Sequence, residues 1–197
     1  MKRVLRIAAW AALATIFLAA VCAPVIAPHP YDRQFRETPD SPPSGEFKLG
    51  TDSLGRDRLS RLLHGSRITL LLAPAGALLT TLLAALAGGA SGVAGGRVDR
   101  LVMAGSDVCM CMPWLFLMMA IRAALPLDTP GWVSTVLTFL LVAALGWPAA
   151  ARPVRASVRV MMASDFVLLA RASGISRWRE FRSHLLPNLW PVLTAQF

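Results

Sequence analysis

Long stretches without a charged residue constrain the fold of this chain more than any other feature of its sequence. No Asp, Glu, Lys or Arg occurs in 7–28, 68–96 or 129–151, and 101–121 contains only Asp107. A helix that crosses ~30 Å of hydrocarbon needs about 20 mostly apolar residues, rising about 1.5 Å each. These four runs are long enough, whereas the uncharged run 185–197 is too short. The sequence therefore predicts four complete spans and the start of a fifth.

The composition agrees with a helical membrane protein. Hydrophobic residues make up 55% of the 197 residues and charged residues 16%, below the roughly 25% charged residues of a soluble domain. The mean hydropathy is +0.55. These values exclude a disordered chain and an ordinary cytosolic enzyme. Only helices satisfy the backbone of an open chain in lipid, and the runs lack the alternation of a membrane barrel. We expect an all-α, polytopic fold.

Basic residues near the spans predict the orientation. Segment 1–6 carries Lys2, Arg3 and Arg6, the connection after the second run carries Arg97 and Arg100, and 152–184 is rich in arginine. These three segments fall on one side, which the positive-inside rule assigns to the cytoplasm. The N-terminus is then cytoplasmic and 29–67 is periplasmic. The first run exceeds the ~7–15-residue core of a signal peptide, so we expect a retained span.

The motifs that could carry chemistry each lack required residues or the required spacing. GTDSLGRD at 50–57 has the glycine spacing of a phosphate loop, but it lacks the Lys and Ser/Thr that contact nucleotide and magnesium. Cys109 and Cys111 point about 200° apart on a helix, so they cannot face one ion together. The three histidines lie in separate segments, and no catalytic constellation is present. We expect neither a metal site nor an enzyme.

Two features within the apolar runs have alternative interpretations. Asp107 is the one acid inside a span, and such residues are candidate functional sites. It is a candidate intramembrane polar site on a substrate path, or a structural partner for a neighbouring helix or basic loop. Gly88, Gly92 and Gly96 continue a small-residue stripe that begins at Ala84. Such a stripe predicts close helix packing, either within the chain or in a dimer.

Segment 152–184 is the most informative part of the sequence, and it predicts two short helices. Ser164 can cap the first helix over 165–172, and Gly174 can end it with a left-handed turn. Ser176 can cap the second helix, which we expect to end before Pro187. Its residues Trp178, Phe181 and Leu185 share one face. That apolar ridge suits a groove on a partner, a helix lying on anionic lipid being the main alternative.

Several blocks in one register resemble a known family. The segments 165–174 (DFVLLARASG) and 185–188 (LLPN) look like the EAA loop of bacterial ATP-binding-cassette importer permeases. The segments 49–57 (LGTDSLGRD), 95–100 (GGRVDR) and 146–148 (GWP) resemble the dipeptide/oligopeptide/nickel permeases. The similarity is to the second of the two permease types in each pair.

This resemblance implies the type I importer permease fold in the bacterial inner membrane. Such a chain forms half of a solute pathway with a second permease subunit. Two separate ATPase subunits bind the ATP, so this chain needs no cofactor, and a periplasmic solute-binding protein delivers a peptide or nickel. Membrane lipid surrounds the spans, and no nucleic acid is involved. The positions that correspond to the ATPase-coupling element are Asp165, Ala170, Arg171, Ala172, Gly174 and Pro187.

The chain also departs from the family pattern. The family often has Glu-Ala-Ala where this chain has Leu168, Leu169 and Ala170. Family members complete a fifth span and add a sixth, whereas this sequence stops at Phe197, so we expect an apparently truncated member of the family, either a fragment or a truncated gene product. The alternative is a truncated, transport-inactive subunit that only associates with other permease chains.

Overall fold

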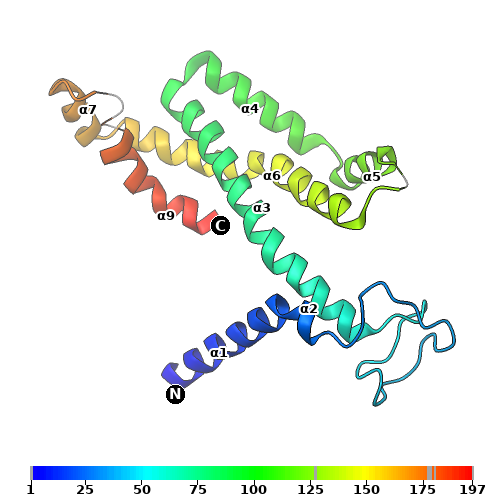
Figure 1. Cartoon of the computed structure of the whole chain (residues 1–197). Coiled ribbons are helices and arrows are strands. Elements are labelled where there is room, and N and C mark those ends of the chain that lie inside the picture. The colour runs from blue at the N-terminus through cyan, green and yellow to red at the C-terminus, as the bar shows by residue number, and fades with distance from the viewer. Residues whose placement is uncertain (1, 127, 177–178, 180, 197) are drawn as a thin grey trace. The chain divides into compact units, whose positions relative to one another are not determined.

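The computed structural model describes residues 2–126, 128–176, 179 and 181–196. It divides into two compact units, Met1–Ala73 and Pro74–Phe197. Within the described residues the chain is helical and forms no strand, apart from an isolated bridge between Thr51 and Asp57. The elements, all but η1 labelled in Figure 1, are α1 (Lys2–Val21), α2 (Ala23–Ile26), α3 (Arg58–Ala94), α4 (Gly96–Cys111), α5 (Trp114–Ala124), α6 (Gly131–Met162), α7 (Asp165–Ala172), η1 (Phe181–Leu185) and α9 (Leu186–Gln196).

Three helices are long and apolar enough to cross a membrane: Arg3–Val21 within α1, α3 and α6. The pair α4 and α5 is apolar enough only when the two are taken together, which makes up to four spans. α3 and α6 are longer than the uncharged runs that they contain. A charged residue is unfavourable in lipid, but it does not end a helix. Thus α3 begins at Arg58 and α6 continues to Met162.

The first unit contains α1, α2, a folded connection and the start of α3. Asp57 caps α3, since its carboxylate accepts hydrogen bonds from the Ser60 amide at 3.1 Å and the Leu59 amide at 3.3 Å. This carboxylate also accepts the Ser60 hydroxyl at 2.6 Å. The rings of His29, Phe35 and Phe47 pack against one another over the connection. The cap fixes where the long helix begins.

The third apolar run is a broken helix rather than a straight span. α4 and α5 meet at an angle of 80°. Met112 has an extended backbone (ψ 131°), and Pro113 precedes the first residue of α5. Proline has no amide hydrogen to donate and disfavours the α conformation of the residue before it, which favours a break at this position.

α6 is the central helix of the second unit, and α4, α5, α7 and α9 all pack against it (Figure 1). Val154 and Val158 of α6 are fully buried and form a core with Leu189 of α9. Gly88 and Gly92 of α3 lie against these same valines. α6 is therefore held between two helices over this part of its length.

The contacts between α3 and α6 occur in the same order along both helices. Thr80 donates to the Ala143 carbonyl at 3.2 Å, Gly88 faces Val154, and Gly92 faces Val158. The two helices therefore run in the same direction, as expected of two spans joined by one return pass.

Gly96 does not continue this packing face. Its φ is +53°, and nothing lies within 4 Å of the position that a Cβ would take. Gly96 belongs to the turn between α3 and α4, where its neighbour Gly95 also has a positive φ of +59°. The small-residue stripe therefore ends at Gly92, because α3 ends at Ala94.

We predict opposite effects of alanine at two adjacent glycines of α3. A Cβ at Gly88 would lie 2.9 Å from Val154 Cβ and would also meet the Ala151 carbonyl, whereas a Cβ at Gly89 meets nothing within 4 Å. Gly88→Ala should destabilise the fold by about 1–3 kcal/mol through overpacking. Gly89→Ala should stabilise it by about 0.5–1 kcal/mol, because alanine loses less backbone entropy in a helix. Thermal unfolding in detergent measures both, and equal shifts would contradict the α3–α6 packing.

Candidate functional site

The helix α7 presents one face to the chain and another to its surroundings. Val167 is fully buried and Ala170 is 7% exposed, so this side packs inward, against the rest of the chain. Leu168 and Leu169 lie on the outer side, 50% and 67% exposed. The segment 165–172 therefore forms the helix that the sequence predicts, but Ala170 lies on its inner face. A partner that approaches α7 meets the two leucines.

Gly174 ends α7 in the left-handed conformation expected from the sequence, with φ +73°. The Ile175 amide donates to the Ala170 carbonyl at 3.2 Å, and the Ser173 amide donates to the Leu169 carbonyl at 3.0 Å. The bond from Ile175 is the one that closes a Schellman motif. The turn gives α7 a sharp, hydrogen-bonded end.

The second helix predicted after Gly174 is only partly visible. Trp178 lies outside the described residues, and so does the side chain of Arg171. Ser176 Oγ accepts the Arg179 amide at 3.4 Å, in the manner of an N-cap. Of the predicted ridge, Leu185 is buried and Phe181 is 38% exposed.

The expected end of this helix before Pro187 is wrong. A π-helical turn, Phe181–Leu185, leads directly into α9, which contains Pro187 in its first turn and Pro191 further on. A first-turn proline needs no amide partner, because the first amides of a helix have no carbonyl to meet. Pro187 therefore marks the junction of two helical segments.

The remaining coupling candidates lie at the surface. Asp165 begins α7 and Ala172 ends it, and both are exposed. Asp165 also stands where an acid interacts favourably with the helix dipole.

Asp107 pairs with Arg152 of α6. The Asp107 side chain is 62% exposed and that of Arg152 is 48% exposed. The structure thus brings Asp107 to a neighbouring helix, one of the two roles that the sequence left open.

A second acid between the same two helices was missed by sequence reasoning. Asp99, in the first turn of α4, accepts hydrogen bonds from Arg155 and Arg159 of α6 and from Ser91 of α3. The distances are 2.7 Å from Arg155 Nη2 and 2.6 Å from Arg159 Nη2. The available signal was the spacing of the two arginines, four residues apart, which places them on one face of a helix.

The glycine-rich segment at 50–57 has a structural explanation. Gly50 and Gly55 have φ values of +72° and +70°, and a Cβ at either would strike a backbone carbonyl, of Ser41 and Phe35 respectively. Asp52 accepts the Leu54 and Arg56 amides, each at 2.9 Å. Burial raises the pKa of the Asp52 carboxyl, but the hydrogen bonds from Arg56 and Leu54 outweigh it and hold this pKa below its ordinary value. The segment is a tight turn, closed by its own side chains.

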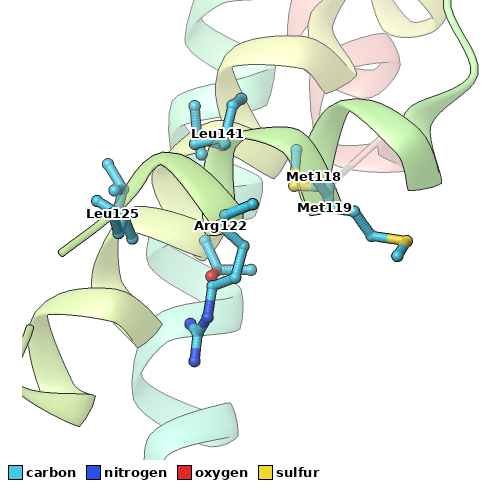
Figure 2. Close-up of a pocket in the computed structure, with 9 residues that line it drawn as sticks. Met118, Met119, Arg122, Leu125 and Leu141 are labelled. Carbon is cyan, nitrogen blue, oxygen red and sulfur yellow. The ribbon is translucent and has the colours of Figure 1, made fainter. Parts of the chain in front are cut away.

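A pocket of about 440 Å³ lies between α5 and α6 in the second unit (Figure 2). Apolar side chains, among them Met118, Met119 and Leu141, form most of its wall, and Arg122 contributes a guanidinium. Arg122 also donates a hydrogen bond to Ser134. None of the nine described lining residues is an acid or a histidine. The pocket thus suits apolar groups rather than a metal ion. Elsewhere in the described chain, no three His, Cys, Asp or Glu side chains gather to hold a metal.

Comparison with known proteins decides the family. Residues 72–197 match the family described as "Binding-protein-dependent transport system inner membrane component". The chain belongs to this family. It is therefore a membrane component of a transport system and not an enzyme, and its fold class is the helical permease fold. The match includes α4 to α9 and most of α3, and so it contains α7 and the Asp99 contacts.

Several relatives of this transport component are peptide or nickel permeases. It is 33% identical over 181 residues to the dipeptide transport system permease protein DppC of Bacillus subtilis (strain 168), covering 92% of this chain and 55% of that protein. It is 35% identical over 187 residues to the di/tripeptide permease protein DppC of Pseudomonas aeruginosa (strain UCBPP-PA14), covering 92% and 60%. It is 36% identical over 168 residues to the nickel permease protein NikC of Escherichia coli (strain K12), covering 83% and 58%.

These matches confirm the resemblance to peptide and nickel permeases. The chain spans between about half and three fifths of the length of these relatives.

We predict that Gly174→Ala weakens the end of α7. An L-residue in the left-handed conformation costs about 1–2 kcal/mol, so hydrogen-exchange protection of the Ile175 amide should fall by about fivefold to thirtyfold. Gly174→Asn should cause a smaller loss, because asparagine tolerates this conformation better. Unchanged protection in Gly174→Ala would contradict the observed turn.

Proposed function

We propose that this chain is a permease subunit of an ATP-binding-cassette importer and that α7 couples it to a separate ATPase. The observation that carries the proposal is a short helix, sharply ended by Gly174 and outwardly apolar, that directly follows the membrane-type helix α6 of a transport-family chain. A second permease subunit would complete the solute pathway. Two ATPase subunits would supply the nucleotide sites, and a periplasmic binding protein would deliver solute.

The proposed coupling depends on the length of α6. Its 32 residues extend about 48 Å at 1.5 Å per residue, which exceeds the ~30 Å hydrocarbon core. One continuous helix can thus reach from within the membrane to α7, which begins three residues after α6 ends. A displacement of α7 would therefore reach the membrane-embedded part of α6 without crossing a flexible linker.

The proposed contact with the ATPase is apolar. Leu168 and Leu169 occupy positions where permeases of this kind often have Glu and Ala, and both point outward. Two exposed leucines, placed next to each other on one helix, would be buried in a groove on the partner. Asp165 and Ala172 would lie at the two ends of this contact.

The proposed orientation places α7 in the cytoplasm of a bacterium, next to the inner membrane. Lys2, Arg3 and Arg6 at the N-terminus favour that side for the start of α1. α3 and α6 run parallel, so both would end on this side, which brings the basic residues after each helix to the cytoplasm. The proposed solute is a dipeptide, an oligopeptide or nickel, as in the related permeases.

We predict that Leu169→Asp weakens binding of the ATPase subunits. A carboxylate in an apolar contact must lose its hydration, so co-purification of the ATPase should fall at least about tenfold. Leu169→Met should keep most of the binding, because methionine preserves volume and apolarity.

The matched control is Val160→Asp, which places the same charge on the exposed surface of α6, where Val160 is 74% exposed. It should leave ATPase binding close to that of the unaltered chain. Equal retention of the ATPase by Leu169→Asp and by Val160→Asp would contradict docking through the outer face of α7.

A further inference from the structure

We infer that Asp99 is a positioning residue that makes the adjoining ends of α3, α4 and α6 move together when α7 is displaced. The inference rests on the proposed function, because it requires an ATPase that moves α7. It adds to that function a specific connection between the coupling helix and two further helices.

One carboxylate joins three helices at this point. Asp99 Oδ1 accepts the Ser91 hydroxyl from the last turn of α3 and Nε of Arg155 from α6. Asp99 Oδ2 accepts Nη2 of Arg155 at 2.7 Å and Nη2 of Arg159 at 2.6 Å. Asp99 itself belongs to α4. Each carboxylate oxygen thus has two donors, and the donors come from both neighbouring helices.

The burial of this cluster distinguishes it from an ordinary surface ion pair. The Asp99 side chain is 9% exposed, and Ser91 is fully buried. Arg155 binds the carboxylate through two nitrogens, a geometry that fixes orientation as well as distance. By contrast, Asp107 and Arg152, which also link α4 to α6, are both largely exposed.

The Asp99 cluster lies at the end of α6 through which a displacement of α7 would be transmitted to the membrane helices. Arg155 and Arg159 occupy the last two turns of α6, which ends at Met162, and α7 starts at Asp165. Nearby, Gly88 and Gly92 of α3 meet α6 through close packing, which carries no directional bond, and the α3–α6 hydrogen bond from Thr80 to the Ala143 carbonyl lies further along both helices. The Asp99 carboxylate supplies directional bonds at the end of α6, which is the end that a displacement of α7 would move first. Without it, α6 could shift against α3 while the apolar packing adjusts.

The test measures the distance between α3 and α6 by electron paramagnetic resonance. Spin labels are attached at Val93→Cys on α3 and Val160→Cys on α6, both exposed positions, after alanine replaces Cys22, Cys109 and Cys111. The chain is studied in its complex with the permease and ATPase partners in lipid nanodiscs. Distances are compared without nucleotide and with ATP and vanadate. With Asp99 present, we expect the same narrow distance in both states.

Asp99→Asn should keep that distance without nucleotide, because the Gly88 and Gly92 packing persists, and should give a shifted, wider distribution with ATP and vanadate. Ser91→Ala, which removes only the link to α3, should show a smaller change of the same kind. Asp107→Asn is the matched control, since it removes the exposed α4–α6 pair, and it should behave like the unaltered chain.

Three results would overturn the inference. The first is a label-to-label distance that changes with nucleotide in the unaltered chain. The second is an unchanged distance in Asp99→Asn with ATP and vanadate, and the third is a distance distribution in Asp99→Asn that is already wide without nucleotide. The last would show that Asp99 only supports the fold. Failure of the ATPase subunits to bind the unaltered chain would instead refute the proposed function, so the two failures are distinguishable.

Discussion

The close approach of α3 and α6 is the constraint on which the second unit depends. Gly88 and Gly92 present no side chain, so Val154 and Val158 can lie directly against the backbone of α3. The same two valines pack on their other side against Leu189 of α9. In lipid, apolar surfaces gain little by leaving their surroundings, so helices associate through tight packing and polar bonds. Small residues on α3 and branched residues on α6 provide that packing, and α7 takes its position from the end of a helix held on both sides.

The two acids of α4 show how burial decides what an ion pair can do. Asp99 and Asp107 both pair with arginines of α6, and they lie on the same helix. The Asp107–Arg152 pair lies at the surface of the chain, where both side chains have room to change their conformation. The buried Asp99 loses its hydration and is stable only because several donors replace that water. A fully satisfied buried carboxylate of this kind fixes one arrangement of its neighbours.

Local features of the chain were predictable from the sequence, and long-range ones were not. Run length located the long apolar helices α1, α3 and α6, and the glycine at 174 gave the end of α7 because a left-handed turn depends only on neighbouring residues. The break at Pro113 was missed because the apolar composition continues across it. The Asp99 cluster was missed for a different reason. Its partners lie 8, 56 and 60 residues away along the chain, so only the packing of three helices brings them together.

The inward position of Ala170 changes how the coupling helix should be understood. Val167 and Ala170, three residues apart, share the buried face of α7, and their small or branched side chains allow α7 to lie close to the chain. The residues available to a partner are then Leu168 and Leu169, and Leu168 stands where the family pattern often has Glu. A partner groove that offers a cation there would leave that cation without its acidic partner, at a cost in affinity. An apolar groove would instead bury both leucines. Under the proposed coupling, the exchange of an acid for leucine would therefore favour an ATPase with a matching apolar groove over one whose groove offers a cation.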